Sequence, residues 1–125
     1  MSEIAKEHPL EFKARGEDLE NYRVPGGESF ADCRLRVLAA LRRILASAGD
    51  DILIVGHAGV NRVILCDALG IPLANVLRIG QAYGCLNILE CGDAGCRVKL
   101  LNLVPREAAI ARVKAETQPK ATAIT

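Results

Sequence analysis

The 125 residues of the chain are enough for one domain with a single hydrophobic core. Half of them are hydrophobic, a quarter are charged and the formal net charge is +1, which excludes the strongly basic composition typical of proteins that bind nucleic acid or an anionic membrane. No apolar run approaches the roughly 20 residues of a membrane span, and the N-terminus lacks the pattern of a signal peptide. We therefore expect a cytoplasmic protein whose partners must be inferred from a site.

The first half of the chain predicts two helices and a buried strand. Residues 2–8 have the pattern of a helix end that Pro9 stops, and a polar connection rich in glycine and proline follows. From Ser29 to Ala48, apolar residues recur at spacings of three and four, which predicts an amphipathic helix. Residues 52–55 are all apolar, a pattern typical of a parallel strand that is covered on both faces.

The second half predicts further helices and two strands. In chain order we expect a helix over 60–69, a short helix over 73–79, strands over 85–90 and 97–103 joined by a turn at 92–95, and a helix over 105–116. Residues 117–125 have the composition of a disordered tail. These elements predict a single α/β domain over residues 1–116, a three-layer sandwich with a mostly parallel sheet between helices.

The five cysteines are an odd number in apolar surroundings, which favours reduced, buried thiols over a disulfide framework. Cys91 and Cys96 flank the predicted turn, so they are candidates to face each other across a hairpin, and the sequence leaves open whether they pair. A zinc site needs about four ligands, and no second pair of Cys or His has suitable spacing. We therefore expect no metal and no other cofactor.

The stretch ILIVGHAGVNRVIL, residues 52–65, predicts an anion site around His57. This histidine follows a buried strand and precedes a helix, and ligands of α/β sheets gather at the carboxyl ends of strands. The first amides of the helix lack internal partners, and the small residues Ala58 and Gly59 let a phosphate approach the backbone. His57 is the candidate catalytic and phosphate-binding side chain. The alternative is a polar residue that hydrogen-bonds a loop.

Two residues of the following helix are candidates for a supporting or a purely structural role. Arg62 lies one turn into the helix and offers a planar cation near His57. An arginine in a first turn more often points to solvent or pairs with a surface carboxylate. Asn61 precedes it and is assigned to the same supporting group.

The motif PGGES, residues 25–29, predicts how the first long helix begins. Ser29 as N-cap and Asp32 three residues later form a variant of the capping box, and Asp32 is spaced for an ion pair with Arg36. These contacts leave Glu28 unexplained. A carboxylate at this place either favours the helix dipole or takes a direct catalytic role.

Taken in order, these motifs resemble the second half of the histidine phosphatase superfamily, in its phosphoglycerate mutase-like branch. The similarity rests on PGGES with Asp32 and Arg36, on ILIVGHAGVNRVIL, and on LGIPLANVLRIGQAYGCLNILE. It implies a metal-independent phosphomonoesterase that forms a phosphohistidine and acts on a small phosphorylated substrate. His57 matches the family's second active-site histidine, and the Ala58 amide matches a phosphate-binding amide.

The segment QAYGCLN favours the branch that includes α-ribazole phosphatase. The residues concerned are Gln81, Tyr83, Cys85 and Asn87. Their alternative interpretation is a turn followed by an edge strand.

The chain departs from the family at its N-terminus. The 125 residues contain no Arg-His-Gly motif, which carries the family's nucleophile, and lack its catalytic glutamate. The nearest string, Ala14-Arg15-Gly16, offers no lone pair for attack. We expect the C-terminal portion of a phosphatase, inactive alone, or alternatively a non-catalytic module that binds phosphate or a protein partner. Without the family's central first strand, we also expect a homodimer or a rearranged sheet.

Overall fold

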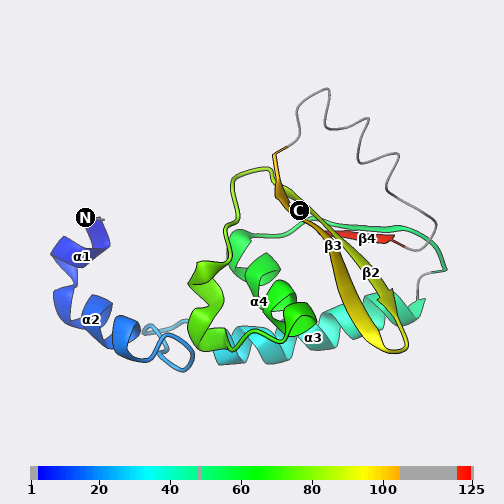
Figure 1. Ribbon diagram of the computed structural model, residues 1–125. Helices are drawn as coiled ribbons and strands as arrows, with labels where there is room; N and C mark the ends of the chain where they lie inside the picture. Colours follow the sequence, from blue (N-terminus) through cyan, green and yellow to red (C-terminus); the bar gives the residue numbers. More distant parts are fainter. Residues whose placement is uncertain (1–2, 48, 105–120, 125) are drawn as a thin grey trace.

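The structure, a computed structural model, describes residues 3–47, 49–104 and 121–124 (Figure 1). The helices are α1 (Glu3–Glu7), α2 (Pro9–Glu17), α3 (Phe30–Ser47), α4 (Ala58–Leu69) and the 3₁₀-helix η1 (Leu73–Arg78). The strands are β1 (Ile52–Ile54), β2 (Leu86–Gly92), β3 (Gly95–Leu103) and β4 (Ala121–Ile124). None of the described helices is long and apolar enough to cross a membrane.

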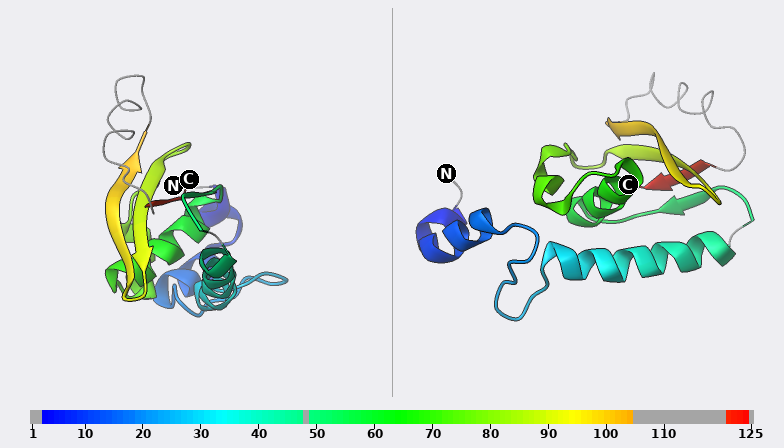
Figure 2. Two further views of the ribbon diagram at one scale, coloured as in Figure 1. Left: turned by 90° about the vertical axis from the view of Figure 1, so that its right-hand side faces the viewer. Right: turned by 60° about the horizontal axis from the view of Figure 1, so that its bottom comes forward.

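The four described strands form one mixed sheet in the order β1-β4-β2-β3. Only β1 and β4 are parallel, whereas β2 is antiparallel to both β3 and β4. The expected mostly parallel sheet is therefore wrong for these strands, because the two-residue turn after Gly92 folds β3 back along β2. Helices α3 and α4 lie on the same side of the sheet (Figure 2), so the described elements form two layers.

Strand β4 corrects the prediction of a disordered tail over 117–125. Residues 121–124 lie between β1 and β2, and Ile124 pairs with Ile54 on one side and Asn87 on the other. The side chain of Ile124 is only 1% exposed. Backbone pairing on both sides and burial of Ile124 hold a segment that has little local signal of its own. The helix predicted over 105–116 lies outside the described residues.

The core confirms the helical periodicity read from the sequence. Helix α3 spans Phe30–Ser47 against a prediction of 29–48, and its buried side chains pack with those of α4, η1 and β2. The central members are Val37, Leu41, Val63, Leu65 and Leu89. The predicted stop of α4 at Gly70 is also confirmed, because Gly70 takes the left-handed conformation and the Ile71 amide donates to the Cys66 carbonyl at 2.8 Å.

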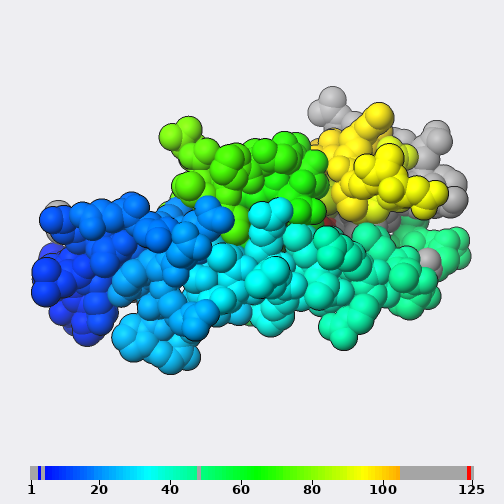
Figure 3. Space-filling model, turned by 90° about the horizontal axis from the view of Figure 1, so that it is seen from below, coloured from blue at the N-terminus to red at the C-terminus, as the bar shows by residue number. Residues whose placement is uncertain are grey.

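The N-terminal region contains a helix that the sequence analysis missed. Pro9 does follow the end of α1, but it also occupies the start of α2, where its fixed φ and missing N–H are well tolerated. The segment expected to be a polar connection is therefore helical as far as Glu17. Figure 3 shows both N-terminal helices at one end of the molecule, beside the beginning of α3.

The cysteines divide into two groups. Cys33, Cys66 and Cys85 are buried and form no disulfide, as predicted. Cys91 and Cys96, whose pairing the sequence left open, form a disulfide across the β2–β3 hairpin. The two-residue turn explains the difference, since it places the two cysteines directly opposite each other in the register.

Candidate functional site

His57 stands between the end of β1 and the start of α4, as predicted. Its backbone is extended, with φ −104° and ψ 157°, and its carbonyl accepts a hydrogen bond from the Asn61 amide at 2.9 Å. The side chain is exposed and makes no hydrogen bond to any residue that the structure describes. No described residue hydrogen-bonds the imidazole. This does not support the alternative interpretation, in which His57 is a polar residue bonded to a loop.

Helix α4 begins two residues earlier than predicted. Because Ala58 is its first residue, the amides of Ala58 and Gly59 lie in the first turn and have no carbonyl partner within the helix. The positive end of the helix dipole faces the same place. Ala58 and Gly59, which the sequence predicts to bind phosphate through their amides, thus both lie in the first turn of α4, directly after His57.

A pocket of about 330 Å³ opens between the start of α4 and the loop before β2. His57, Ala58, Asn61 and Arg62 line it from one side, and residues 81–85 from the other. Arg62 pairs with no carboxylate of the described residues, and its Nε donates to the Ile79 carbonyl at 2.8 Å. This bond holds the guanidinium beside the pocket that Arg62 and His57 both line.

Side-chain amides form the buried floor behind this pocket. Gln81 and Asn87 exchange two hydrogen bonds of 2.8 Å, and the Asn102 amide donates to the Asn87 side chain at 2.8 Å. Asn61 is 3% exposed and donates weakly to Gln81, at 3.4 Å, while its Oδ1 has no partner among the described residues. The sequence pointed to Gln81 and Asn87 only through family resemblance, and it gave no signal for Asn102.

The alternative interpretation of residues 81–87 was a turn followed by an edge strand, and only the turn is confirmed. Gly84 has a φ of +66° and sits in a turn, and Tyr83 is fully exposed. The strand that follows is not an edge strand, since β2 pairs with β3 and with β4.

A second pocket, of about 270 Å³, lies on the other side of His57. Its wall is largely apolar, and the residues that form it are Leu19, Tyr22, Val24, Phe30, Cys33, Gly59 and Val60, with Arg15, Glu28, Ser29 and His57 as the polar members. Arg15 was missed as a site residue because it belongs to the unpredicted helix α2. His57 is the residue that borders both pockets.

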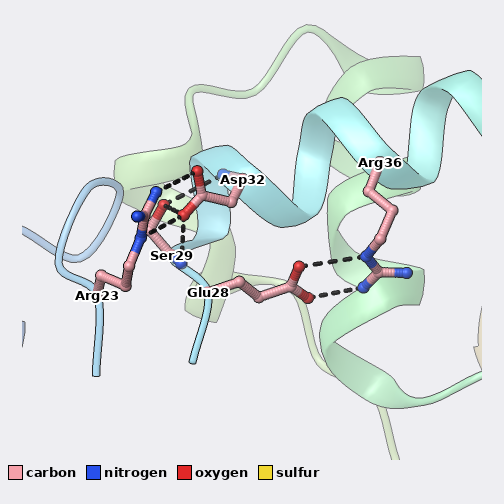
Figure 4. A network of polar contacts seen from close by, with 5 residues as sticks. All are labelled: Arg23, Glu28, Ser29, Asp32 and Arg36. Carbon is pink, nitrogen blue, oxygen red and sulfur yellow. Dashed lines mark hydrogen bonds and ion pairs between the residues drawn. The ribbon is translucent and has the colours of Figure 1, made fainter. Parts of the chain in front are cut away.

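The PGGES motif forms two separate ion pairs (Figure 4). The capping box is confirmed: the Ser29 amide donates to Asp32 at 2.9 Å, and the Asp32 amide donates to the Ser29 hydroxyl at 3.1 Å. The predicted pair of Asp32 with Arg36 is wrong. Asp32 instead pairs with Arg23 at 2.7 Å, and Arg36 pairs with Glu28 at 2.6 Å. Arg23 and Glu28 both belong to the loop before α3, which brings them closer to Asp32 and Arg36 than these two side chains are to each other.

Glu28 is thus paired with Arg36, and it lines the second pocket together with His57. The hydrogen bond from Arg36 lowers the pKa of the Glu28 carboxyl, so this group is ionised at neutral pH and is a poor proton donor. Asp32 and Arg36 line neither pocket and instead hold the start of α3.

Cys33 lines the second pocket, as His57 does. Burial is the main cause that raises the pKa of its thiol, and the Glu28 carboxylate adds to the effect. A protonated thiol is a weak nucleophile, so Cys33 is not an activated cysteine. The described residues also contain no cluster of three or more His, Cys, Asp or Glu side chains placed to hold a metal ion.

Acid should weaken the start of α3 through Asp32. The hydrogen bonds from Ser29, followed by Arg23, lower the pKa of Asp32 from 3.8 to about 2. A lowered pKa stabilises the folded chain above the ordinary value, and this contribution is lost as the pH falls from about 4 to about 2. In urea unfolding curves, the Asp32→Asn variant should therefore lose less stability over this window than the wild type. The control variant Asp93→Asn, in the β2–β3 turn, should lose stability with pH as the wild type does. If the stability of Asp32→Asn also fell in parallel with that of the wild type, the contribution assigned to Asp32 would be contradicted.

An exposed imidazole, the first amides of a helix and a fixed guanidinium thus lie at one pocket of an α/β fold. The sequence matches the histidine phosphatase superfamily (branch 1) over residues 1–104. The chain therefore belongs to this family, as the resemblance in the sequence indicated.

Curated relatives agree with this membership. The chain is 36% identical over 70 residues to the fructose-2,6-bisphosphatase of Saccharomyces cerevisiae, a match that covers 56% of the chain and 15% of the yeast protein. It is 32% identical over 94 residues to 6-phosphofructo-2-kinase/fructose-2,6-bisphosphatase 4 of Rattus norvegicus and of Homo sapiens, covering 66% of the chain and 20% of each relative. The chain thus spans a fifth or less of the length of these relatives.

Proposed function

We propose that these residues form the phosphate-binding, C-terminal part of a metal-independent phosphomonoesterase. The observation that carries the proposal is the unengaged imidazole of His57 at the start of α4, in the same pocket as Arg62. The amides of Ala58 and Gly59 bind the phosphoryl oxygens. His57 and Arg62 donate further hydrogen bonds, which strengthen as negative charge builds during transfer.

These residues lack a nucleophilic histidine that would accept the phosphoryl group from the substrate. Apart from His57, the chain has one histidine, His8, which precedes α2 and lies 3.7 Å from the Glu11 carboxylate. His8 lines neither of the two pockets beside His57. We infer that a histidine supplied from outside these 125 residues attacks the substrate, while His57 stabilises the transferring group.

We propose a phosphomonoester with an uncharged, partly apolar leaving group as the substrate, as in the α-ribazole phosphatase-like branch. The apolar lining of the second pocket supports this choice. Its nearby arginines, Arg23 and Arg36, are already paired with Asp32 and Glu28. Among the described residues that line this pocket, Arg15 is the one arginine or lysine available to a second phosphate, as in the substrate named for the yeast and mammalian relatives.

Three further features belong to the same proposal. We infer that a second helical layer completes a three-layer fold around the sheet. We also propose a cytoplasmic location and a homodimer, as the composition and the incomplete sheet predicted.

Inorganic phosphate tests the site directly. In ¹⁵N NMR titrations, phosphate should shift the amides of Ala58 and Gly59 and the ring of His57, and the shifts should shrink at high salt. His57→Ala should weaken binding by about tenfold or more, since it removes a hydrogen bond to a charged group. His8→Ala is the matched control and should bind as the wild type does. A titration that moves neither these amides nor the ring would remove the proposed site.

The missing phosphoryl acceptor favours a second candidate, a non-catalytic module that binds phosphate. Both candidates predict the same phosphate titration. They differ in whether a supplied histidine restores turnover.

A further inference from the structure

A third pocket, of about 470 Å³, shares no lining residue with the two pockets beside His57. Helix α3, helix α4 and the turn of the β2–β3 hairpin each supply one of its walls. Figures 1 and 3 show the tip of this hairpin beside α3. Pockets that bind small molecules have volumes of roughly 300–1,000 Å³, so this one is large enough for a ligand of its own.

The floor of this pocket is apolar and belongs to the core. Five side chains of α3 and α4 form it, namely Leu38, Leu41, Leu45, Ile64 and Ala68. Leu41 is 8% exposed and Ile64 is 3% exposed, so the packing of the core holds the floor in place. Gly92 and Gly95 form part of the opposite wall, and a side chain at either position would meet open space. An apolar group can therefore reach the core between the helices and the hairpin.

Two exposed charges of opposite sign also line the pocket. Arg42 extends from α3, and Asp93 lies in the hairpin turn. Neither side chain forms an ion pair or a hydrogen bond with a described residue, so they do not pair with each other. Asp67 lines the same pocket, but Arg34 already binds its carboxylate at 3.2 Å. The apolar floor thus lies beside one unpaired guanidinium and one unpaired carboxylate.

The charges restrict the chemistry of a complementary ligand. A carboxylate on the ligand would pair with Arg42, and an ammonium group would pair with Asp93. A purely anionic ligand would be repelled by Asp93, and a purely cationic one would be repelled by Arg42. A zwitterion with an apolar body satisfies both charges and the floor together.

We propose that this pocket binds an apolar α-amino acid. The carboxylate of the ligand binds Arg42, its ammonium group binds Asp93, and its side chain lies on the floor between Leu41 and Ile64. The proposal does not rest on the proposed function, because the pockets beside His57 contain none of these residues.

NMR titration of the full chain with L-tryptophan tests the binding. The methyl signals of Leu41 and Ile64 should shift, whereas the ring signals of His57 should not. Tryptamine lacks the carboxylate and indole-3-propionate lacks the ammonium group, so each should bind about tenfold more weakly than L-tryptophan. Phosphate should leave both methyl signals unchanged, which separates this test from the phosphate titration of the His57 site.

Variants of the two charged residues test which end of the ligand each one binds. Arg42→Gln should bind L-tryptophan about tenfold more weakly but should bind tryptamine no more weakly than the wild type does. Asp93→Asn should show the mirror image, a weaker affinity for L-tryptophan and an unchanged affinity for indole-3-propionate. Arg43→Gln, at the next position of α3 and outside the pocket, is the matched control and should bind as the wild type does. Ala68→Phe should abolish binding because the added ring fills the pocket.

Three results would overturn the proposal. Equal binding of L-tryptophan, tryptamine and indole-3-propionate would show an apolar cavity that does not use its charges. Methyl signals that stay unchanged up to the solubility limit of L-tryptophan would show no binding. Signals that shift with protein concentration alone would assign the pocket to contact with a second copy. If Ala68→Phe fails to fold, the variants of the exposed Arg42 and Asp93 decide the proposal by themselves.

Discussion

The purified 125-residue chain should hydrolyse p-nitrophenyl phosphate and α-ribazole phosphate no faster than its His57→Ala variant. Phosphoryl transfer by this route needs a neutral imidazole in line with the leaving oxygen and a proton donor for that oxygen. One imidazole cannot attack phosphorus and stabilise the equatorial oxygens at the same time. Glu28 is held as a carboxylate by Arg36, and the buried Cys33 keeps its proton, so neither replaces the missing groups.

Supplying the missing histidine should restore turnover. A peptide or upstream segment that carries an apolar strand ending in Arg-His-Gly should raise hydrolysis at least about 100-fold above background, the usual scale of one positioned catalytic group. The same addition to His57→Ala should give little activity, while His8→Ala should respond fully. Turnover by the unsupplemented wild type that disappears in His57→Ala would make His57 the nucleophile, and our assignment of its role would be wrong. A peptide that binds without restoring turnover would favour the non-catalytic module.

Local signals account for the parts of the structure that the sequence predicted well. The spacing of apolar residues is enough to place α3, because this helix buries one continuous stripe against the core. Helix α4 is recognised as a longer apolar run that Gly70 ends, since its buried residues include four consecutive positions, 63–66. The position of His57 followed from a buried strand that runs directly into a helix. Ser29 and Asp32 formed the predicted cap because both groups belong to the same helical turn.

Two of the errors share a tertiary origin. Asp32 is spaced for Arg36, but the loop that carries Arg23 and Glu28 offered each of them a nearer partner. Residues 121–124 have little strand signal alone, and they become a strand between two edges supplied from elsewhere in the chain. Sequence periodicity does not report such contacts, because both examples join segments that are not neighbours in one element.

The amide floor is the least predictable part of the site, and its loss should be costly. Asn87 has no exposed surface, and its side chain binds Gln81 twice, the Ile124 carbonyl and the Asn102 amide. Asn87→Ala removes these bonds at once, and the Asn102 amide and the Ile124 carbonyl lose a partner that the Ala side chain cannot replace. A buried polar group left unpaired costs about 1–3 kcal/mol.

We therefore expect Asn87→Ala to lower the free energy of unfolding by about 3 kcal/mol or more, measured by urea denaturation followed by circular dichroism. Asn75→Ala, in η1, is the control, because the side chain of Asn75 has no hydrogen bond to any described residue, and it should change stability by less than about 0.5 kcal/mol. The Gln81 and Asn102 signals should also move in NMR spectra of Asn87→Ala, since both residues lose the same partner. Equal stability of the two variants would mean that water replaces Asn87, and that the floor beneath the phosphate pocket is open to solvent rather than built from side chains.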